Sequence, residues 1–229
     1  LFYRHYTDEE TNNLDIPQIG NNCQISKNCT IEKGVIIGSD VKIHPGAIIK
    51  QSSVIGNGSV IGSNSVISNA ILGEHIYIGS NTSIGQRGFG FYIDKGKNID
   101  IFHTGRVIIQ SNVSIGSCCT IDRGSFSDTI IGKNSYIDNL CHVAHNVVIG
   151  ENSVFAAMTG IAGSAKIGNN VLTGGQVGIA GHIKIGNNVQ IAAKSGVFKS
   201  LNNGEIVMGN PAINKYKFLK NYKKVYGKK

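Results

Sequence analysis

The sequence predicts an all-β fold, a parallel β-helix of six-residue repeats that is followed by a short C-terminal α-helical tail. The first observation is a period, because aliphatic residues recur every six positions along most of the chain. The second is the residue after each aliphatic one, which is usually glycine or another small residue. The third is composition: 30 of the 229 residues are glycine and only 7% are aromatic, which suits small side chains stacked in layers.

The repeat can be followed through nearly the whole chain. Its aliphatic positions are Ile19, Ile25, Ile31, Ile37, Ile43, Ile49, Ile55, Ile61, Ile67, Leu72, Ile78, Ile84, Ile109, Ile115, Ile121, Ile131, Ile137, Val143, Ile149, Phe155, Ile161, Ile167, Thr173, Ile179, Ile185, Ile191 and Val197. Neither the 3.6-residue period of a helix nor the alternation of an amphipathic strand produces this spacing. Three hexads form one triangular coil, with the aliphatic residue pointing inward. The residue after it turns a corner, which favours glycine and asparagine with their access to positive φ. The pattern gives about nine coils, or roughly 43 Å of prism at about 4.8 Å per coil.

Two interruptions and two flanking segments complete the organisation. Residues 86–108 leave the repeat as a long loop with glycine and aromatic residues, and a shorter insertion, RGSFSD, lies between Ile121 and Ile131. Loops of this kind on a rigid scaffold often carry function. We therefore expect a linker or cap over residues 1–18, a β-helix over residues 19–201, and a turn with a basic helix over residues 202–229.

Charge and composition exclude several classes of protein. The net charge is +8, but no acidic residue follows Glu205, and seven lysines crowd the C-terminal segment. The basic character is therefore a local tail and does not indicate a nucleic-acid-binding face. No apolar run is long enough to span a membrane. Five cysteines without a metal-ligand spacing fit small core thiols in a reducing cytoplasm.

The segment IDNLCHVAHNVVIG is the strongest candidate for chemistry, because it places His142 and His145 close together. One coil of eighteen residues separates His145 from Gly163, and His182 lies two coils away and one place over. These residues therefore form a column on one side of the prism. A neutral histidine can accept a proton from an attacking amine or hydroxyl, and a glycine N–H can receive an oxyanion. The column suits acyl transfer without a covalent enzyme intermediate.

Two other interpretations of the histidines remain open at this point. Prisms that resemble γ-class carbonic anhydrases bind zinc through three histidines shared between subunits, although the HxxH spacing here differs from the HxxxxH pair of that family. Alternatively, the histidines belong to a structural prism without chemistry.

Six strings resemble the UDP-3-O-acylglucosamine N-acyltransferases, a family of hexapeptide-repeat acyltransferases in lipid A synthesis. These are GFGF (88–91), GRVIIQSNVSIGSCCTIDRGSFSDTIIG (105–132), IDNLCHVAHNVVIG (137–150), GIAGSAKIG (160–168), GIAGHIKI (178–185) and GNPA (209–212). The resemblance implies a left-handed β-helix. It also implies transfer of a 3-hydroxyacyl chain from acyl carrier protein to the glucosamine 2-amino group.

The resemblance also implies roles for individual residues. His145 matches the general base, Gly163 the oxyanion donor and His182 a second histidine near the substrate. The residues expected to bind or position the substrate are Asp138, His142 and Asn146.

The partners implied by the resemblance are acyl carrier protein, a UDP-sugar and two further copies of the chain in a homotrimer, in the bacterial cytoplasm. The donor is a phosphopantetheine thioester, so no tightly bound cofactor and no metal are expected. The acidic carrier protein would meet the basic tail at Lys215, Lys217, Lys220, Lys223 and Lys224.

The chain departs from the family pattern at three places. Arg87 stands where the family usually has aspartate, and His142 where it often has glutamine. The family also begins with a uridine-binding domain, and residues 1–5 resemble the segment just after it. Either the sequence is a fragment, or the protein lacks that domain. These departures keep two alternatives open: an acyltransferase with another acceptor or with acetyl-CoA as donor, and a non-catalytic scaffold.

Overall fold

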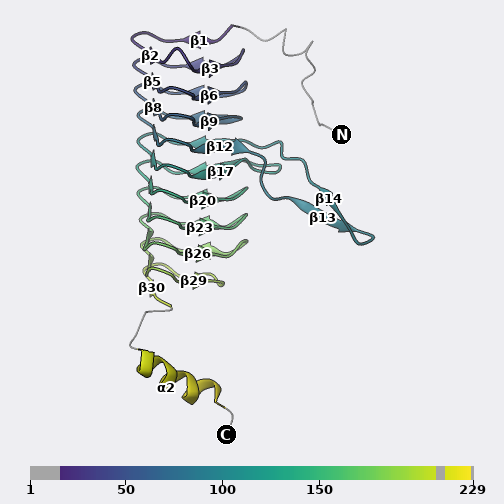
Figure 1. Cartoon of the computed structure of the whole chain (residues 1–229), viewed down its shortest axis with the longest axis vertical. Helices are drawn as coiled ribbons and strands as arrows, with labels where there is room; N and C mark the ends of the chain where they lie inside the picture. Colours follow the sequence, from purple (N-terminus) through teal and green to yellow (C-terminus); the bar gives the residue numbers. More distant parts are fainter. Residues whose placement is uncertain (1–15, 210–214, 228–229) are drawn as a thin grey trace.

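The computed structural model describes residues 16–209 and 215–227. Its main body is a left-handed β-helix with three parallel sheets, which Figure 1 shows as a stack of coils. The sheets hold nine, ten and nine strands, close to the expected nine coils. The fold class predicted from the repeat is therefore confirmed.

Most strands are only two residues long. The first sheet contains β1 (Gln18–Ile19), β4 (Ile36–Ile37), β7 (Val54–Ile55), β10 (Ala70–Leu72), β15 (Val107–Ile109), β18 (Thr129–Ile131), β21 (Val148–Ile149), β24 (Lys166–Ile167) and β27 (Lys184–Ile185). The second contains β2 (Gln24–Ile25), β5 (Lys42–Ile43), β8 (Val60–Ile61), β11 (Tyr77–Ile78), β16 (Ser114–Ile115), β19 (Tyr136–Ile137), β22 (Val154–Phe155), β25 (Leu172–Thr173), β28 (Gln190–Ile191) and β30 (Ile206–Val207). The third contains β3 (Thr30–Ile31), β6 (Ile48–Ile49), β9 (Val66–Ile67), β12 (Ser83–Gln86), β17 (Thr120–Asp122), β20 (His142–Val143), β23 (Gly160–Ile161), β26 (Gly178–Ile179) and β29 (Gly196–Val197).

The core is a column of inward-facing aliphatic residues in the predicted frame. Ile61, Ile115 and Phe155, for example, are at most 1% exposed. Ile19 is 48% exposed because it belongs to the first described coil, which has no described coil on its outer side. Stacking of identical residues from coil to coil buries each layer under the next.

The corner geometry differs from the expectation in one respect. Positive φ occurs mainly three residues after the aliphatic position, as at Asn152 (φ 56°) and Asn170 (φ 56°). Among the described glycines directly after an aliphatic position, only Gly85 (φ 78°) has a positive φ. At the other corners, the glycine is required by close approach instead. A Cβ on Gly150 would lie 2.6 Å from the carbonyl carbon of Gly168 in the next coil. The prediction that the glycine itself takes a positive φ is therefore wrong at the described corners other than Gly85.

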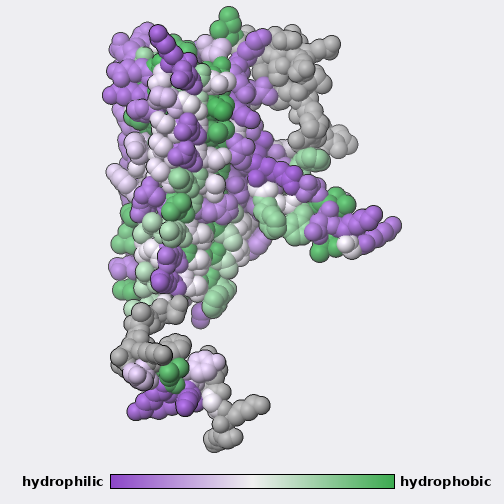
Figure 2. All heavy atoms as spheres, viewed as in Figure 1, coloured by the Kyte–Doolittle hydropathy of each residue, from purple (hydrophilic) through white to green (hydrophobic). Residues whose placement is uncertain are grey.

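The 86–108 insertion contains an antiparallel hairpin that the repeat pattern did not indicate. Strands β13 (Phe91–Asp94) and β14 (Lys97–Asp100) pair across a turn at Lys95 (φ 47°) and Gly96 (φ 76°). Two consecutive positive φ angles are typical of a type I′ turn. The hairpin projects from the prism (Figure 1), and apolar side chains lie open on it (Figure 2).

The C-terminal end of the β-helix lies beyond the predicted boundary at residue 201. Strand β30 pairs with β28 and extends the second sheet to Val207. The register joins Ile191 to Val207, which is shorter than a full coil of three hexads, so the hexad count fails there. The predicted basic helix is present as α2 (Lys215–Tyr226). Residues 1–15 of the predicted linker and residues 210–212 of the GNPA turn lie outside the described residues.

Within the described ranges, no helix has both the length and the apolar character needed to cross a bilayer.

Candidate functional site

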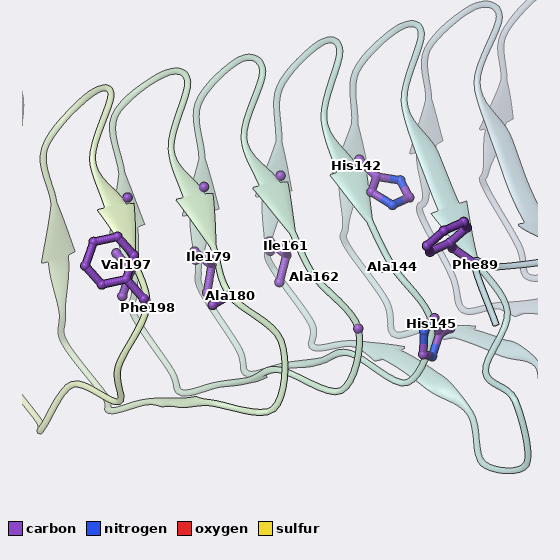
Figure 3. Close-up of a pocket in the computed structure, with 14 residues that line it drawn as sticks. Phe89, His142, Ala144, His145, Ile161, Ala162, Ile179, Ala180, Val197 and Phe198 are labelled. Carbon is purple, nitrogen blue, oxygen red and sulfur yellow. The ribbon is translucent and has the colours of Figure 1, made fainter. Parts of the chain in front are cut away.

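An apolar groove runs along the outer face of the third sheet. Its floor consists of three glycines, Gly160, Gly178 and Gly196, which stand in register on successive strands and continue the line of His142. The groove has a volume of about 510 Å³. Figure 3 shows His145 and Phe89 at one end and Phe198 at the other. Because glycine has no side chain, the outer face of the strands is bare backbone along this line.

The ring of His145 is held in one tautomer by its neighbour Asn146. The His145 Nδ1 atom lies 2.9 Å from the Asn146 Oδ1 atom. A carboxamide oxygen can only accept a hydrogen bond, so Nδ1 must carry the proton. The other ring nitrogen, Nε2, then keeps its lone pair, which is the form that a general base needs.

The orientation of the Asn146 amide is itself fixed by the second insertion. Its Oδ1 accepts a hydrogen bond from the Ser125 N–H at 3.0 Å, and its Nδ2 donates to the Ser127 carbonyl at 3.0 Å. Its own N–H donates to the Thr129 hydroxyl at 2.8 Å. A flipped amide would place an NH₂ group against the Ser125 N–H, so the insertion determines the tautomer of His145.

Gly163 lies against the free nitrogen of His145. A Cβ at residue 163 would lie 2.6 Å from Nε2 and 2.7 Å from Cε1 of His145, so only glycine fits beside the ring. The N–H of Gly163 has no acceptor among the described residues. Gly163 stands two residues after an aliphatic position of the repeat. At another edge of the β-helix, the N–H groups at the same repeat position each donate to an asparagine side chain at 2.7–2.8 Å, at Glu151, Asn169 and Asn187. The site therefore combines an imidazole nitrogen that can accept a proton with an N–H donor that has no described acceptor, one coil apart.

His142 is connected to a buried carboxyl group at the same end of the groove. Its Nδ1 lies 2.7 Å from the Thr120 hydroxyl, and its Nε2 lies 3.7 Å from Asp122 Oδ2. Burial raises the pKa of Asp122, while the neighbouring His142 and His145 act in the opposite direction. Sequence reasoning did not single out Asp122, although it lies in the TIDRG string.

His103 is the second residue near the base that sequence reasoning missed. It comes from the 86–108 insertion, is 5% exposed, and its ring centroid lies 5.3 Å from that of His145. Burial lowers the pKa of His103, and the neighbouring His145, Arg87 and Arg123 lower it further. A signal was present in the GFGF string, because Gly88 and Gly90 have no room for a Cβ against the His103 ring.

Three predicted residues, Asn146, His182 and Asp138, are not among the groove-lining residues. Asn146 contacts His145 behind the groove. His182 is exposed at a corner (φ 60°), and its N–H donates to the Gly163 carbonyl at 3.1 Å. Its backbone therefore touches the site, but its side chain is not among the groove-lining residues. Asp138 is exposed at a different corner, where its Oδ1 accepts hydrogen bonds from the N–H and Nδ2 of Asn139 at 2.7 and 3.0 Å.

The predicted carrier-protein residues belong to α2. Lys220, Lys223 and Lys224 are exposed, and the side chains of Lys215 and Lys217 lie outside the described part of the chain. In the described ranges, no three His, Cys, Asp or Glu side chains gather in a metal-binding group.

Two family models match the chain. The bacterial transferase hexapeptide model (six repeats) matches residues 128–163 and 164–199, and the GMPPB C-terminal domain model matches residues 16–102. The UDP-3-O-acylglucosamine N-acyltransferase of Methylorubrum extorquens (strain PA1) is 43% identical over 82 residues, which are 36% of this chain. The matched stretch covers only 23% of that relative, so the chain spans less than a quarter of its length.

Solved structures match a larger part of the chain. LpxA from Acinetobacter baumannii aligns with 86% of this chain and 72% of its own, with a TM-score of 0.67 and 26% identity. UDP-N-acetylglucosamine O-acyltransferase (LpxA) from Moraxella catarrhalis aligns with 86% and 77% of the two chains, with a TM-score of 0.56 and 27% identity.

Proposed function

We propose that this chain, which belongs to the hexapeptide-repeat proteins, is a cytoplasmic N-acyltransferase of lipid A synthesis. It would move a 3-hydroxyacyl chain from acyl carrier protein to the 2-amino group of UDP-3-O-acylglucosamine. The observation that carries the proposal is the pairing of His145 Nε2, freed by the Asn146 hydrogen bond, with the unpaired N–H of Gly163 at the end of an apolar groove. The name of the Methylorubrum extorquens relative supports the acceptor.

The proposed reaction is direct aminolysis of a thioester. The substrate amine attacks the thioester carbonyl carbon and forms a new C–N bond, while His145 Nε2 takes a proton from the amine. The Gly163 N–H donates to the oxyanion of the tetrahedral intermediate. The C–S bond then breaks, and the imidazolium of His145 returns its proton to the leaving thiolate. His142 is placed to contact the substrate, since it lines the same end of the groove.

The glycine floor of the groove suits the hydrocarbon part of an acyl chain. Three strands without outward side chains give about 14 Å of open floor at about 4.8 Å per strand. Ala162 and Ala180 line the groove beside this floor. At the far end of the groove, the ring of Phe198 lies over Gly196. A Cβ added to Gly196 would lie 3.3 Å from the Cε1 atom of Phe198. Phe198 therefore limits the length of chain that the groove accepts.

Replacement of Phe198 with alanine is expected to shift donor preference toward longer acyl chains. Phe198 is 82% exposed, so its loss should leave the melting temperature nearly unchanged. The measurement is kcat/KM with acyl carrier proteins that carry chains of increasing length. Phe126, which is 80% exposed on the second insertion, provides the matched control as Phe126→Ala. An unchanged length preference in Phe198→Ala would exclude the groove as the acyl site.

The carrier protein and the assembly are further parts of the proposal. Exposed lysines on α2 would attract an acidic carrier protein, and rising salt would weaken the encounter. On the second sheet, Tyr136, Val154 and Leu172 stand in register and are 39–57% exposed. This apolar strip is a suitable contact between copies in a homotrimer.

The function is tested with the purified chain and a radiolabelled 3-hydroxyacyl donor. Carrier protein thioesters are compared with acetyl-CoA, and UDP-3-O-acylglucosamine is compared with UDP-N-acetylglucosamine. We expect amide formation with the first donor and the first acceptor. Ester formation on UDP-N-acetylglucosamine would favour the activity named for the Moraxella catarrhalis protein. Absence of transfer with every pair would support a non-catalytic scaffold.

A further inference from the structure

His103 connects the hairpin insertion to the base of the proposed reaction. Its Nδ1 accepts a hydrogen bond from the Gly88 N–H at 2.8 Å. An acceptor nitrogen carries no proton, so the ring is neutral and its proton lies on Nε2. That Nε2 atom is buried and has no hydrogen-bond partner among the described residues. An unpaired buried donor costs free energy, so a hydrogen bond at Nε2 does not explain why the ring lies there.

The segment from Gly88 to Gly90 packs tightly against the His103 ring and against the Cβ atom of His145. A Cβ on Gly88 would lie 2.8 Å from His103 Cε1 and 2.9 Å from His145 Cβ. A Cβ on Gly90 would lie 2.5 Å from His103 Nε2. The two glycines therefore allow the backbone to lie against His103 and beside His145. Between them, Phe89 is 81% exposed and lines the groove next to His145.

We propose that His103 is a positioning residue, which holds the Gly88–Gly90 segment against His145 and thereby places Phe89 over the groove. The proposal rests on the acyl transfer proposed above and adds a residue that does not touch the substrate. His103 performs this role only as a neutral ring. Protonation would put a hydrogen on Nδ1, which could then no longer accept the Gly88 N–H.

The charges around His103 work against its protonation. His145, Arg87 and Arg123 lie close enough to lower its pKa, after burial, which has the largest effect. Among these groups, Arg87 is paired with Asp100 at 2.7 Å, and the Arg123 Nε donates to the Gly105 carbonyl at 2.6 Å. The buried Asp122 carboxyl interacts electrostatically with His145. The site therefore keeps His103 neutral in the pH range where an ordinary histidine, with a pKa of 6.5, begins to charge.

Two variants at residue 103 distinguish a side chain that positions the Gly88–Gly90 segment by a hydrogen bond from one that only fills the space beside His145. His103→Ala removes the acceptor for Gly88, whereas His103→Gln offers a side-chain carbonyl that accepts the same hydrogen bond and cannot titrate. We expect His103→Ala to lower kcat by roughly 10- to 100-fold, as expected for a displaced catalytic group. His103→Gln should recover most of the lost rate at neutral pH, because its side-chain carbonyl still accepts the Gly88 N–H. His44→Ala, at an exposed histidine far along the prism, is the control and should match the wild type.

Hydrogen exchange gives a second readout that does not depend on activity. Exchange at the Gly88 amide should be fast in His103→Ala and slow in the wild type, in His103→Gln and in His44→Ala. If the wild-type chain transferred no acyl group, this pattern would still support the positioning of the segment, while the proposed function would fail. The inference is overturned if His103→Ala matches the wild type in Gly88 exchange and kcat, or if His103→Gln is as impaired as His103→Ala at every pH.

Discussion

Replacement of His145 with alanine is expected to lower kcat by at least about 100-fold, which is the low end for loss of a general base. The variant loses the Nε2 lone pair that faces Gly163, while the Gly163 N–H stays in place. KM should change much less, because the groove floor and Phe198 are unaffected. Steady-state kinetics with the acylated carrier protein measure both values.

The fold should tolerate this substitution, because His145 is only half-buried and, among the described residues, its side chain is hydrogen-bonded to Asn146 only. Thermal unfolding of His145→Ala should therefore resemble that of the wild type, and His44→Ala again serves as a control for loss of a histidine. Near-normal turnover in His145→Ala would show that another group takes the proton. His142 would be the first to examine, because it lines the groove and lies near the Asp122 carboxyl.

Replacement of Gly163 with alanine is the second large effect that we expect. The added methyl group would lie 2.6 Å from His145 Nε2, so the ring must move away from the oxyanion donor. A displacement of about 1 Å in a catalytic group can cost on the order of 100-fold in rate. The loss should appear in kcat, since the donor N–H itself is retained.

Gly175→Ala is the matched control for this prediction. Gly175 stands at a corner of another edge, where the nearest atom to an added Cβ is the Ala157 carbonyl oxygen at 3.2 Å. Both variants add one methyl group to a corner, but only Gly163→Ala disturbs the base. Equal kcat values in the two variants would contradict the placement of Gly163 beside His145.

The sequence predicted the hexad repeat of the β-helix and the positions of the residues within it. Because the coil repeats, counting one coil onward from His145 correctly placed Gly163 beside its ring, and the buried column followed the aliphatic frame. This works because each hexad makes the same hydrogen bonds to the coil on either side, so sequence separation determines position in space.

The positions of residues in the two insertions, which lie outside the hexad repeat, could not be predicted in this way. The hairpin of residues 91–100 depends on the turn at Lys95 and Gly96, and Gly88, which precedes it, is hydrogen-bonded to His103. Similarly, the hydrogen bond from His145 to Asn146 depends on Ser125 and Ser127, which come from the second insertion. Insertions have no repeat, so the position of their residues relative to His145 cannot be calculated from sequence separation.

The side chain of a residue within the hexad repeat can still point away from a site. His182 was placed near the column by counting, and its N–H does reach the Gly163 carbonyl. Its side chain, however, follows the left-handed corner at φ 60° and lies exposed. Counting gives the position of a backbone atom, whereas the direction of a side chain depends on its place within the corner.

The most direct test of the central claim is the tautomer of His145, measured by nitrogen NMR on ¹⁵N-histidine-labelled protein, with His145→Ala used to assign its signals. The Asn146 hydrogen bond predicts that the neutral ring carries its proton on Nδ1 and has a free lone pair on Nε2. A neutral ring with its proton on Nε2 would contradict the account, because that nitrogen could then not accept a proton from the substrate amine.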